Sequence, residues 1–490
     1  MKVAFIASGF ENLGIEYLSA SLKKDGHDVR LFFDPQIFGG GIFLKIGFLQ
    51  KKFDLKRKII DQVIQWRPDI IGFSCMTHNY HWCLEIASEL RRKNNKTPII
   101  FGGIHPTSVP DDVLSNDCVD MVAVGESERS FGFLLKALEK NDFRTDIGGI
   151  YFKKDRTVIK NPPMSFSENI NDLPYPDKKL FFNKMPGFAK INYSIMASRG
   201  CPYSCSYCCN DLLKKLYKGD NFRRERSVDS VISELKHAKD NYSIKKVFFY
   251  DEVFPFKAEW IIEFSQKYKK EIDLPFKIYY HFKLTNEECI RLLKEAGCNF
   301  IIFGLQSASE KIRREVCNRY YTNDEVRQAV AICRKYDIEF EIDHIFGLPF
   351  ETENEYKAAV EFYRELSPNI IYSYWLTYYP ATSIIKKGLE AGLLTNADMR
   401  QILEGENSFY HKGMFIKNKK ELLSFEMLFD LIPLLPASLH KKITNNRFLL
   451  KIMPKTYLVH FFLLLLASFR LKDNLFMNNF KLLLSKKNVP

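Results

Sequence analysis

Short apolar runs alternate with amphipathic helical periods along most of the chain, and this alternation constrains the fold more strongly than any other feature. In the first third about five such runs, for example residues 3–7 and 70–74, are separated by helical segments. Apolar runs of this length between helices are typical of parallel strands covered on both faces. We therefore predict a doubly wound parallel sheet over residues 1–145, with its ligand beyond the carboxyl ends of the strands.

The same alternation resumes after a punctuated segment. Residues 146–189 contain a hairpin pattern at 150–159, and the prolines that follow it indicate an irregular linker. Over residues 190–385, six further strand–helix units predict a partial (β/α)6 barrel, in which chemistry takes place at the carboxyl ends of the strands. Residues 386–490 are predicted to be helical, apolar and basic.

The cysteines indicate a metal site rather than disulfides. The chain has 11 cysteines, an odd number, and four of them lie between residues 201 and 209. The apolar run after Met1 reaches Glu11 too soon for a secretory signal, so we expect a reducing, cytoplasmic environment. Clustered thiols in that compartment are typical of a metal or an iron–sulfur cluster.

Cys201, Cys205 and Cys208 follow directly after the first predicted barrel strand. Three thiolates on one loop can converge on an iron–sulfur cluster and leave one iron open to bind a substrate. A zinc knuckle would need a fourth ligand, and the adjacent Cys209 is geometrically poor while no histidine follows at a usable spacing. We therefore predict a cluster on these three cysteines, and Cys209 has no assigned role.

The spacing Cys201-x-x-x-Cys205-x-x-Cys208, with an aromatic residue before the last cysteine, resembles the signature of the radical S-adenosylmethionine (SAM) superfamily. Further segments over residues 190–385 resemble its strand-end motifs, namely 248–252, 304–307, 347–352 and 379–382, with Phe350 and Ala381 in place of glycines. The resemblance implies a 4Fe–4S cluster that cleaves SAM into a 5′-deoxyadenosyl radical. It also implies cofactor-binding roles for Tyr207, Asp251, Glu252, Gln306, Ser307 and Gly347.

The first domain resembles the cobalamin-binding domain that precedes many radical SAM enzymes. The resemblance rests on residues 14–18, 74–78, 102–107 and 125–128, most of which follow predicted strands. It implies a bound cobalamin contacted by Ser74, Thr77, His78, Gly102, Gly103, His105, Gly125 and Glu126. The alternative is a domain that has lost its cofactor and only covers the barrel.

The histidines of the first domain are predicted to play different roles. Asp25-Gly-His27 superficially resembles a cobalt-ligating motif, but Arg30 replaces the glycine of that motif. We expect His27 to be a surface cap, and His78 or His105 to approach the cobalamin ring. The glycines at 39–41 would form either an apolar lid or a packed loop.

Catalytic candidates come from the predicted barrel strands. Between residues 339 and 344 acidic and apolar residues alternate, which is unusual for a strand covered on both faces. Asp343 or His344 would then line the active site together with Tyr279 and His281. An edge strand would explain the same alternation.

The C-terminal region combines apolar and basic residues. Its longest uncharged apolar run, residues 456–469, is shorter than the ~20 residues needed to span a bilayer. The flanking cations suit an interfacial anchor, and the alternative is a core helix that closes the open barrel. The cations are interleaved with leucine rather than with stacking aromatic residues, so we expect no nucleic-acid partner.

Taken together, these resemblances imply a cobalamin-dependent radical SAM enzyme that methylates an unactivated carbon. The alternative reaction is an oxidative ring closure of the magnesium-protoporphyrin ester cyclase type, and the alternative class is a non-catalytic cobalamin or redox sensor. By resemblance, an external flavodoxin- or ferredoxin-type donor would supply electrons. The aromatic cluster Tyr372, Tyr374, Trp375, Tyr378 and Tyr379 favours a flat or lipidic small-molecule substrate, and the protein would be cytoplasmic or peripheral to a membrane.

Overall fold

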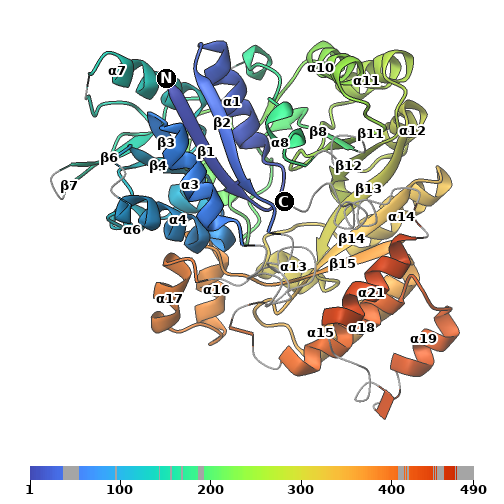
Figure 1. The fold of residues 1–490 in the computed structure, drawn as a ribbon. Helices are drawn as coiled ribbons and strands as arrows, with labels where there is room; N and C mark the ends of the chain where they lie inside the picture. The colour runs from blue at the N-terminus through green and yellow to red at the C-terminus, as the bar shows by residue number, and fades with distance from the viewer. Residues whose placement is uncertain are drawn as a thin grey trace.

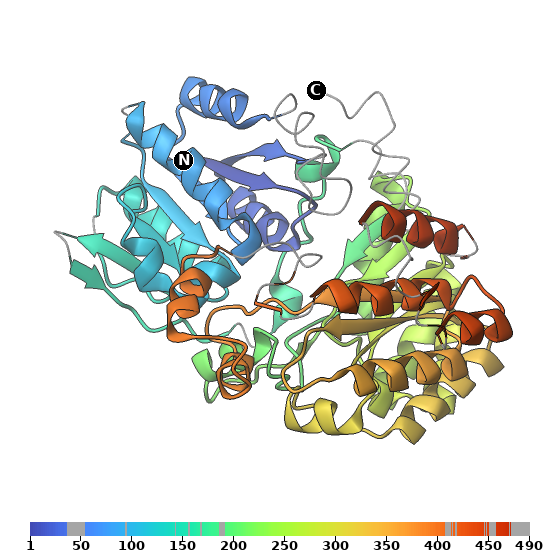
Figure 2. The same ribbon diagram turned by 90° about the horizontal axis from the view of Figure 1, so that it is seen from below.

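Two α/β domains lie side by side, followed along the chain by a group of helices (Figures 1 and 2). The computed structural model describes residues 1–36, 54–93, 96–142, 144–154, 157–166, 169–185 and 192–406. Within residues 413–471 it describes all but 414, 417–418, 445, 447, 450–456 and 470. The glycine segment 39–41 lies outside the described residues.

The first domain is built on a seven-stranded sheet in the order β2-β1-β3-β4-β5-β6-β7. Helices α1 (Leu13–Lys24) and α7 (Glu128–Glu139) cover one face, and α3 (Lys56–Trp66) and α4 (Tyr80–Arg92) cover the other. The first five strands are parallel, as predicted for a doubly wound domain. The strands are β1 (Lys2–Ser8), β2 (Asp28–Asp34), β3 (Ile70–Ser74), β4 (Ile99–Gly102), β5 (Met121–Ala123), β6 (Ile150–Lys154) and β7 (Thr157–Ile159).

The hairpin expected within the linker belongs to this sheet. Strand β6 pairs antiparallel with β5, and β7 pairs antiparallel with β6. Ile150 and Phe152 of β6 are buried in the core under α1 and α7, and the pairing satisfies backbone groups that β5 would otherwise expose at an edge. The sheet is therefore mixed at one edge, and the first domain extends to about residue 159.

The second domain is a six-stranded, fully parallel sheet in the order β15-β14-β13-β12-β11-β8, which confirms the predicted partial barrel. Its strands are β8 (Asn192–Ile195), β11 (Lys246–Phe249), β12 (Phe276–Tyr280), β13 (Cys298–Gln306), β14 (Glu339–Phe346) and β15 (Ile370–Trp375). Helices α10 (Val228–Asn241), α11 (Ala258–Glu271), α12 (Glu287–Ala296), α14 (Asn323–Lys335) and α15 (Glu353–Leu366) cover its outer face.

Alternate side chains of these strands point to opposite faces of the sheet. Ile278 and Ile342 belong to the large core between the sheet and its helices. Phe248, Phe300 and Ile302 form a separate cluster on the inner face of the barrel. Because of this alternation, only the strand residues on the inner face can contact a ligand inside the barrel.

The C-terminal helices complete the molecule. Helices α16 (Ile384–Glu390) and α17 (Asn396–Leu403) reach back to the first domain, where Leu403 packs against its core (Figure 2). Helices α18 (Lys419–Leu431) and α21 (Tyr457–Ser468) pack against each other and against the edge strand β15, while α19 (Ala437–Thr444) packs on α18. The expectation of a helix that closes the open barrel therefore agrees with the packing of α21. None of the described helices combines the length and apolar character needed to cross a bilayer.

A buried cation joins the linker to both domains. Lys178, which precedes α8 (Lys179–Phe182), donates to Glu16 Oε2 at 2.8 Å and to Glu11 Oε1 at 3.1 Å. Its ammonium also lies 5.0 Å from the centre of the Tyr193 ring in β8. Lys178 and Glu16 are fully buried, so this ion pair holds the first domain, the linker and the barrel together.

Candidate functional site

A short antiparallel pair of strands and a buried carboxylate hold the start of the loop that carries the cysteines. Strand β9 (Ser198–Arg199) pairs with β10 (Arg224–Glu225) just before Cys201. Asp251, beyond the end of β11, accepts hydrogen bonds from the Ala197 N–H at 3.2 Å and the Ser198 hydroxyl at 2.5 Å. Burial raises the pKa of Asp251 to about 7. Asp251 therefore positions the loop that carries the cysteines.

Two thiols of this loop accept hydrogen bonds, whereas burial raises the pKa of the third, Cys201, to about 11. Arg319 Nη1 donates to Cys205 Sγ at 3.3 Å, and Asn210 Nδ2 lies 3.6 Å from Cys208 Sγ. A hydrogen bond from Cys209 lowers the pKa of Cys208 to about 6. Donors of this kind favour thiolates, the form that binds iron, so the loop fits an iron–sulfur cluster. Among the described residues, no three His, Cys, Asp or Glu side chains are arranged to hold a metal ion.

Arg319 is a site residue that the sequence patterns did not indicate. Its guanidinium is almost fully buried and also donates to Gly304 O at 2.6 Å and to the hydroxyl of Tyr207 at 3.2 Å. Gly304 lies two residues before the end of β13, and Tyr207 precedes the third cysteine. Arg319 therefore brings a fixed positive charge between the cysteine loop and the carboxyl ends of the barrel strands.

Two acceptor atoms at the ends of neighbouring strands have no partner among the described residues. They are Gln306 Oε1, at the end of β13, and Asp343 Oδ1, on the inner face of β14. A buried polar atom is normally hydrogen-bonded, because leaving it unpaired costs ~1–3 kcal/mol. The two atoms therefore fit a ligand that offers hydroxyl groups above the barrel.

Ser307 belongs to a second hydrogen-bonded group. Its hydroxyl donates to Glu351 Oε1 at 2.6 Å, and the Tyr356 hydroxyl donates to Glu351 Oε2 at 2.9 Å. Tyr356 in turn accepts from the N–H of Gly347 at 3.1 Å. Ser307 and Gly347, both predicted to bind a cofactor, are thus linked through the side chains of Glu351 and Tyr356.

Replacing Glu351 with glutamine is expected to change how stability depends on pH. Burial raises the pKa of Glu351 from its ordinary value of 4.5 to about 8. Between pH ~4.5 and ~8 the folded protein keeps a proton on Glu351 that the unfolded chain has lost. The contribution of this proton to the free energy of unfolding is therefore complete below pH ~4.5 and is lost as pH rises through ~8. The thermal midpoint of the parent should fall relative to that of E351Q across this window. A constant difference from pH 5 to 9 would contradict this.

The predicted catalytic candidates separate into two faces. Tyr279 lies inside the barrel, where its ring stacks on Phe248 with 5.4 Å between ring centres. His281 follows β12, and its ring stacks at 4.0 Å on Tyr203 of the cysteine loop. His344 lies on the opposite face of β14 from Asp343, and its Nδ1 is 2.7 Å from the Tyr363 hydroxyl of α15. His344 is therefore a core residue and cannot line the barrel interior, because neighbouring strand residues face opposite ways.

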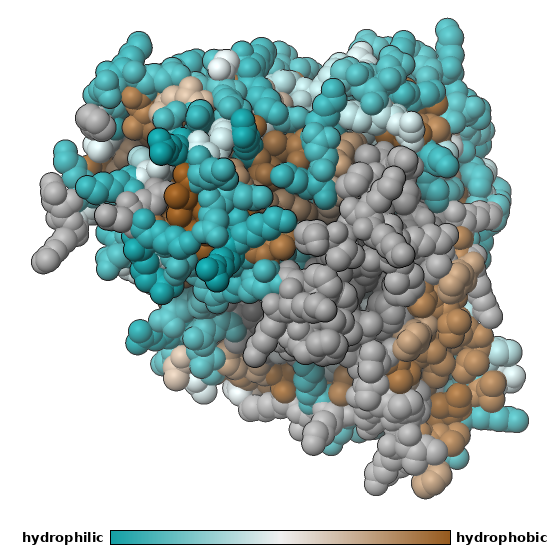
Figure 3. All heavy atoms as spheres, viewed as in Figure 1, coloured by the Kyte–Doolittle hydropathy of each residue, from teal (hydrophilic) through white to brown (hydrophobic). Residues whose placement is uncertain are grey.

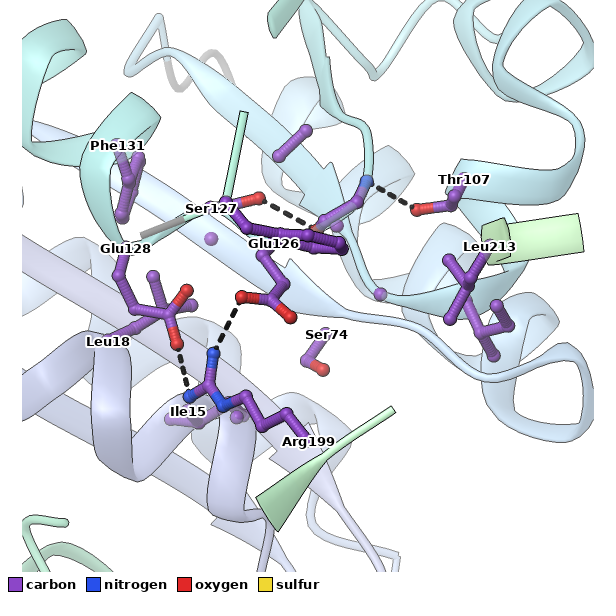
Figure 4. A pocket seen from close by; sticks show the side chains of 18 of the residues that line it. Ile15, Leu18, Ser74, Thr107, Glu126, Ser127, Glu128, Phe131, Arg199 and Leu213 are labelled. Atoms are coloured by element: carbon purple, nitrogen blue, oxygen red, sulfur yellow. Dashed lines mark hydrogen bonds and ion pairs between the residues drawn. The ribbon is translucent and has the colours of Figure 1, made fainter. Parts of the chain in front are cut away.

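A cavity of about 320 Å³ lies between the first domain and the cysteine loop. Of the residues predicted to contact cobalamin, Ser74, Gly102, Gly103, Gly125 and Glu126 line it. Arg199, two residues before Cys201, crosses to the first domain and donates to Glu126 at 3.0 Å and to Glu128 at 2.7 Å (Figure 4). Glu252, beside Asp251, lines the same cavity.

Glycine is required at one wall of this cavity. Gly125 adopts φ +78°, and a Cβ there would lie 2.0 Å from the Tyr217 hydroxyl, which accepts from the N–H of Glu126 at 2.8 Å. The Gly125 N–H donates to Thr107 Oγ1 at 3.0 Å. The cavity is thus a shaped cradle with a small-residue wall and apolar lining from Ile15 and Phe131 (Figure 4). Such a cradle fits part of a large cofactor.

Three predicted cobalamin contacts, Thr77, His78 and His105, are not among the residues that line this cavity. His105 Nδ1 is 3.2 Å from the Thr77 hydroxyl, and its ring packs on Tyr80 with 4.2 Å between ring centres. Burial lowers the pKa of His78 to about 4. His27 is buried, against the expectation of a surface cap, because its Nδ1 lies 3.2 Å from the amino group of Met1.

The two residues that replace family glycines keep a glycine-like backbone. Phe350 adopts φ +67° and Ala381 adopts φ +60°, both in the left-handed region. The loops after β14 and β15 therefore retain a turn that costs a non-glycine residue ~1–2 kcal/mol.

Replacing Ala381 with glycine is accordingly expected to raise the free energy of unfolding by about 0.5–1 kcal/mol. Relief of the left-handed strain outweighs the added freedom of the unfolded chain. Ala391, at φ −80°, is the matched control, and A391G should bring no gain. Chemical denaturation measures the free energy of unfolding of both variants. Equal changes in A381G and A391G would show that Ala381 is not strained.

Comparison with known protein families agrees with the two domains. Residues 3–135 match the model of the B12 binding domain, and residues 195–363 match the model of the radical SAM superfamily. The second match includes the cysteine loop and the barrel strands β11, β12, β13 and β14.

Individual proteins resemble most of the chain. An uncharacterized methyltransferase of Pyrococcus horikoshii is 28% identical over 79% of this chain and 81% of its own length. Bacteriochlorophyllide d C-8(2)-methyltransferase of Chlorobaculum tepidum is 25% identical over 67% of this chain and 70% of its own. The solved structure of the radical SAM methyltransferase TsrM of Kitasatospora setae, with cobalamin and a 4Fe–4S cluster bound, matches with a TM-score of 0.63 at 17% identity. That match covers 78% of this chain and 76% of the other, and it shows a common fold.

Proposed function

The chain belongs to the radical SAM superfamily and carries a B12-binding domain ahead of the radical SAM domain, and we propose that it methylates an unactivated carbon of a small molecule. The observation that carries this proposal is the shared wall between cavity and cysteine loop. Arg199, Gly200 and Glu252 line the cavity, and the first two directly precede Cys201. A cofactor in the cavity would therefore lie beside a cluster on the loop.

Each cofactor has a set of residues that fits it. When bound, the 4Fe–4S cluster supplies the electron that cleaves SAM, and cobalamin carries the methyl group to the substrate. In this proposal Cys201, Cys205 and Cys208 hold the cluster. Gln306 and Asp343 accept hydrogen bonds from SAM hydroxyls, Arg319 pairs with its carboxylate, and Tyr207 orients Arg319. Asp343 thus becomes a SAM-binding residue rather than a catalytic one.

The cavity would hold part of cobalamin. Ser74, Gly102, Gly103, Gly125 and Glu126 contact it in this proposal, and Arg199 keeps Glu126 in place. We propose no cobalt ligand from His27, which lies at the amino terminus beside Met1. Neither His78 nor His105 lines the cavity, and burial lowers the pKa of both to about 4, so either would approach the ring as a neutral imidazole.

The partners follow from the same chemistry. An external flavodoxin- or ferredoxin-type protein would deliver electrons to the cluster. Inside the barrel, Phe248, Tyr250 and Tyr279 contact one another, as do Tyr372 and Tyr374, which favours a flat or lipidic substrate. A peripheral membrane location through residues 386–490 is part of the proposal.

Product analysis tests the reaction. We expect reconstituted protein with cobalamin, SAM and reductant to form both S-adenosylhomocysteine and 5′-deoxyadenosine. S-Adenosylhomocysteine reports methyl transfer from SAM, whereas oxidative ring closure uses the 5′-deoxyadenosyl radical and transfers no methyl group. 5′-Deoxyadenosine without S-adenosylhomocysteine, from protein with a full complement of cobalamin, would refute methylation and favour the cyclase reaction.

A further inference from the structure

Large apolar side chains are exposed on the C-terminal helices. Among the described residues, Phe448 is 68% exposed, Phe469 60% and Phe462 55%, and Leu439 and Leu466 are also exposed. These five residues lie within a stretch of 31 positions, 439–469. The hydrophobic surface at the lower right of Figure 3 lies over the region of α19 and α21 labelled in Figure 1. Large apolar side chains that are exposed in one region of a soluble protein commonly mark an interaction surface.

Helix α21 has two distinct faces. His460, Leu464 and Ala467 are buried, and His460 Nδ1 contacts Asp430 Oδ2 of α18 at 2.6 Å. Phe462, Leu466 and Phe469 follow a spacing of four and three residues, which places them together on another side of the helix. The inner face therefore fastens α21 to the protein, and the exposed outer face is presented to the surroundings.

Helix α19 extends this surface with positive charge. His440 Nε2 contacts Leu428 O of α18 at 2.9 Å, so α19 is fastened by its buried histidine. The neighbouring Leu439, Lys441 and Lys442 are exposed. Between Asp430 and Asp473 the sequence has seven Lys or Arg residues and no Asp or Glu.

We propose that the outer faces of α19 and α21, with Phe448 between them, dock on an anionic lipid bilayer. This inference specifies the peripheral location proposed above and does not depend on the reaction catalysed. Apolar side chains enter the acyl boundary, and Lys and Arg side chains are attracted to the acidic headgroups. A second copy of the same face is a poor partner, because a two-fold contact would bring like charges together.

The position of the surface agrees with this role. Helices α18 and α21 pack on the edge strand β15, at the open side of the barrel. Leu471, two residues beyond Phe469, packs against the inner-face cluster of Phe248, Phe300 and Ile302. Docking would therefore bring the open side of the barrel to the membrane.

Vesicle flotation of the full-length protein tests the proposal. We expect binding to vesicles of about three parts phosphatidylcholine to one part phosphatidylglycerol, weaker binding at high salt, and little binding to phosphatidylcholine alone. The double variant F462S/F469S should lose binding by tenfold or more. The double variant K441Q/K442Q should lose about 30-fold on the anionic vesicles, which is the fold-change for two cations at ~1 kcal/mol each.

A matched control separates this surface from general hydrophobicity. Phe133 on α7 of the first domain is 50% exposed, and F133S should bind vesicles as the parent does. Unchanged thermal midpoints and cluster content would establish that all variants are folded. Parent protein that binds neither vesicle, or equal loss in F133S, would overturn the proposal. A dimer that F462S/F469S dissociates, without vesicle binding, would overturn it in favour of self-association.

Discussion

Replacing Cys205 with alanine is expected to abolish both the iron–sulfur cluster and the cleavage of SAM. A 4Fe–4S cluster with an open iron needs all three cysteine ligands, and no other described thiol lies on this loop except Cys209. Iron and sulfide, about four of each per chain in the reconstituted parent, should fall to background. 5′-Deoxyadenosine should become undetectable. Iron analysis and chromatography of the reaction products measure the two effects independently.

Cys209 provides the matched control for this change. It adjoins Cys208 and hydrogen-bonds to it, so C209A alters the same loop by the same atom. Because Cys209 is not expected to bind iron, this variant should retain the cluster and form 5′-deoxyadenosine. A cluster retained in C205A and lost in C209A would show that the ligand set is wrong.

Replacing Lys178 with methionine is expected to destabilise the protein by ~3–5 kcal/mol. The substitution leaves the carboxylates of Glu16 and Glu11 buried without their cation, which is the costly way to break an internal ion pair. Burial raises the pKa of Glu16 even in the presence of Lys178, so the remaining carboxylate would take up a proton. Urea unfolding followed by fluorescence measures the loss of stability.

Two further variants make this prediction specific. K178M/E16Q removes one of the stranded charges and should recover part of the lost stability. Lys179 is the exposed neighbour of Lys178, and K179M should have little effect. If K178M and K179M unfolded at the same urea concentration, the joining role of Lys178 would be refuted.

The strands and the cysteine loop could be predicted from the sequence because their signals are local. The apolar run at residues 70–74 became β3, and the alternating segment at 339–344 lies in β14. The spacing of Cys201, Cys205 and Cys208 needs no long-range information. The hairpin was found, but its pairing with β5 depends on the edge that this strand offers. Pairing between distant segments leaves no local mark.

Other site residues depend on tertiary contacts. Arg319 lies 114 residues beyond Cys205, in a segment without a metal-ligand pattern, and its role appears only from its contacts with the thiol and Gly304. Asp343 and His344 both looked accessible, and only the packing of α15 decides which of them faces the barrel. His27 looked like a surface residue because its partner, the amino group of Met1, lies 26 residues away.

The most direct test of a SAM-cleaving cluster on Cys201, Cys205 and Cys208 is the formation of 5′-deoxyadenosine by anaerobically reconstituted protein supplied with SAM and a strong reductant. We expect 5′-deoxyadenosine from the parent and from C209A, and none from C205A. A parent with a full cluster and bound SAM that yields no 5′-deoxyadenosine under any reductant would contradict this expectation.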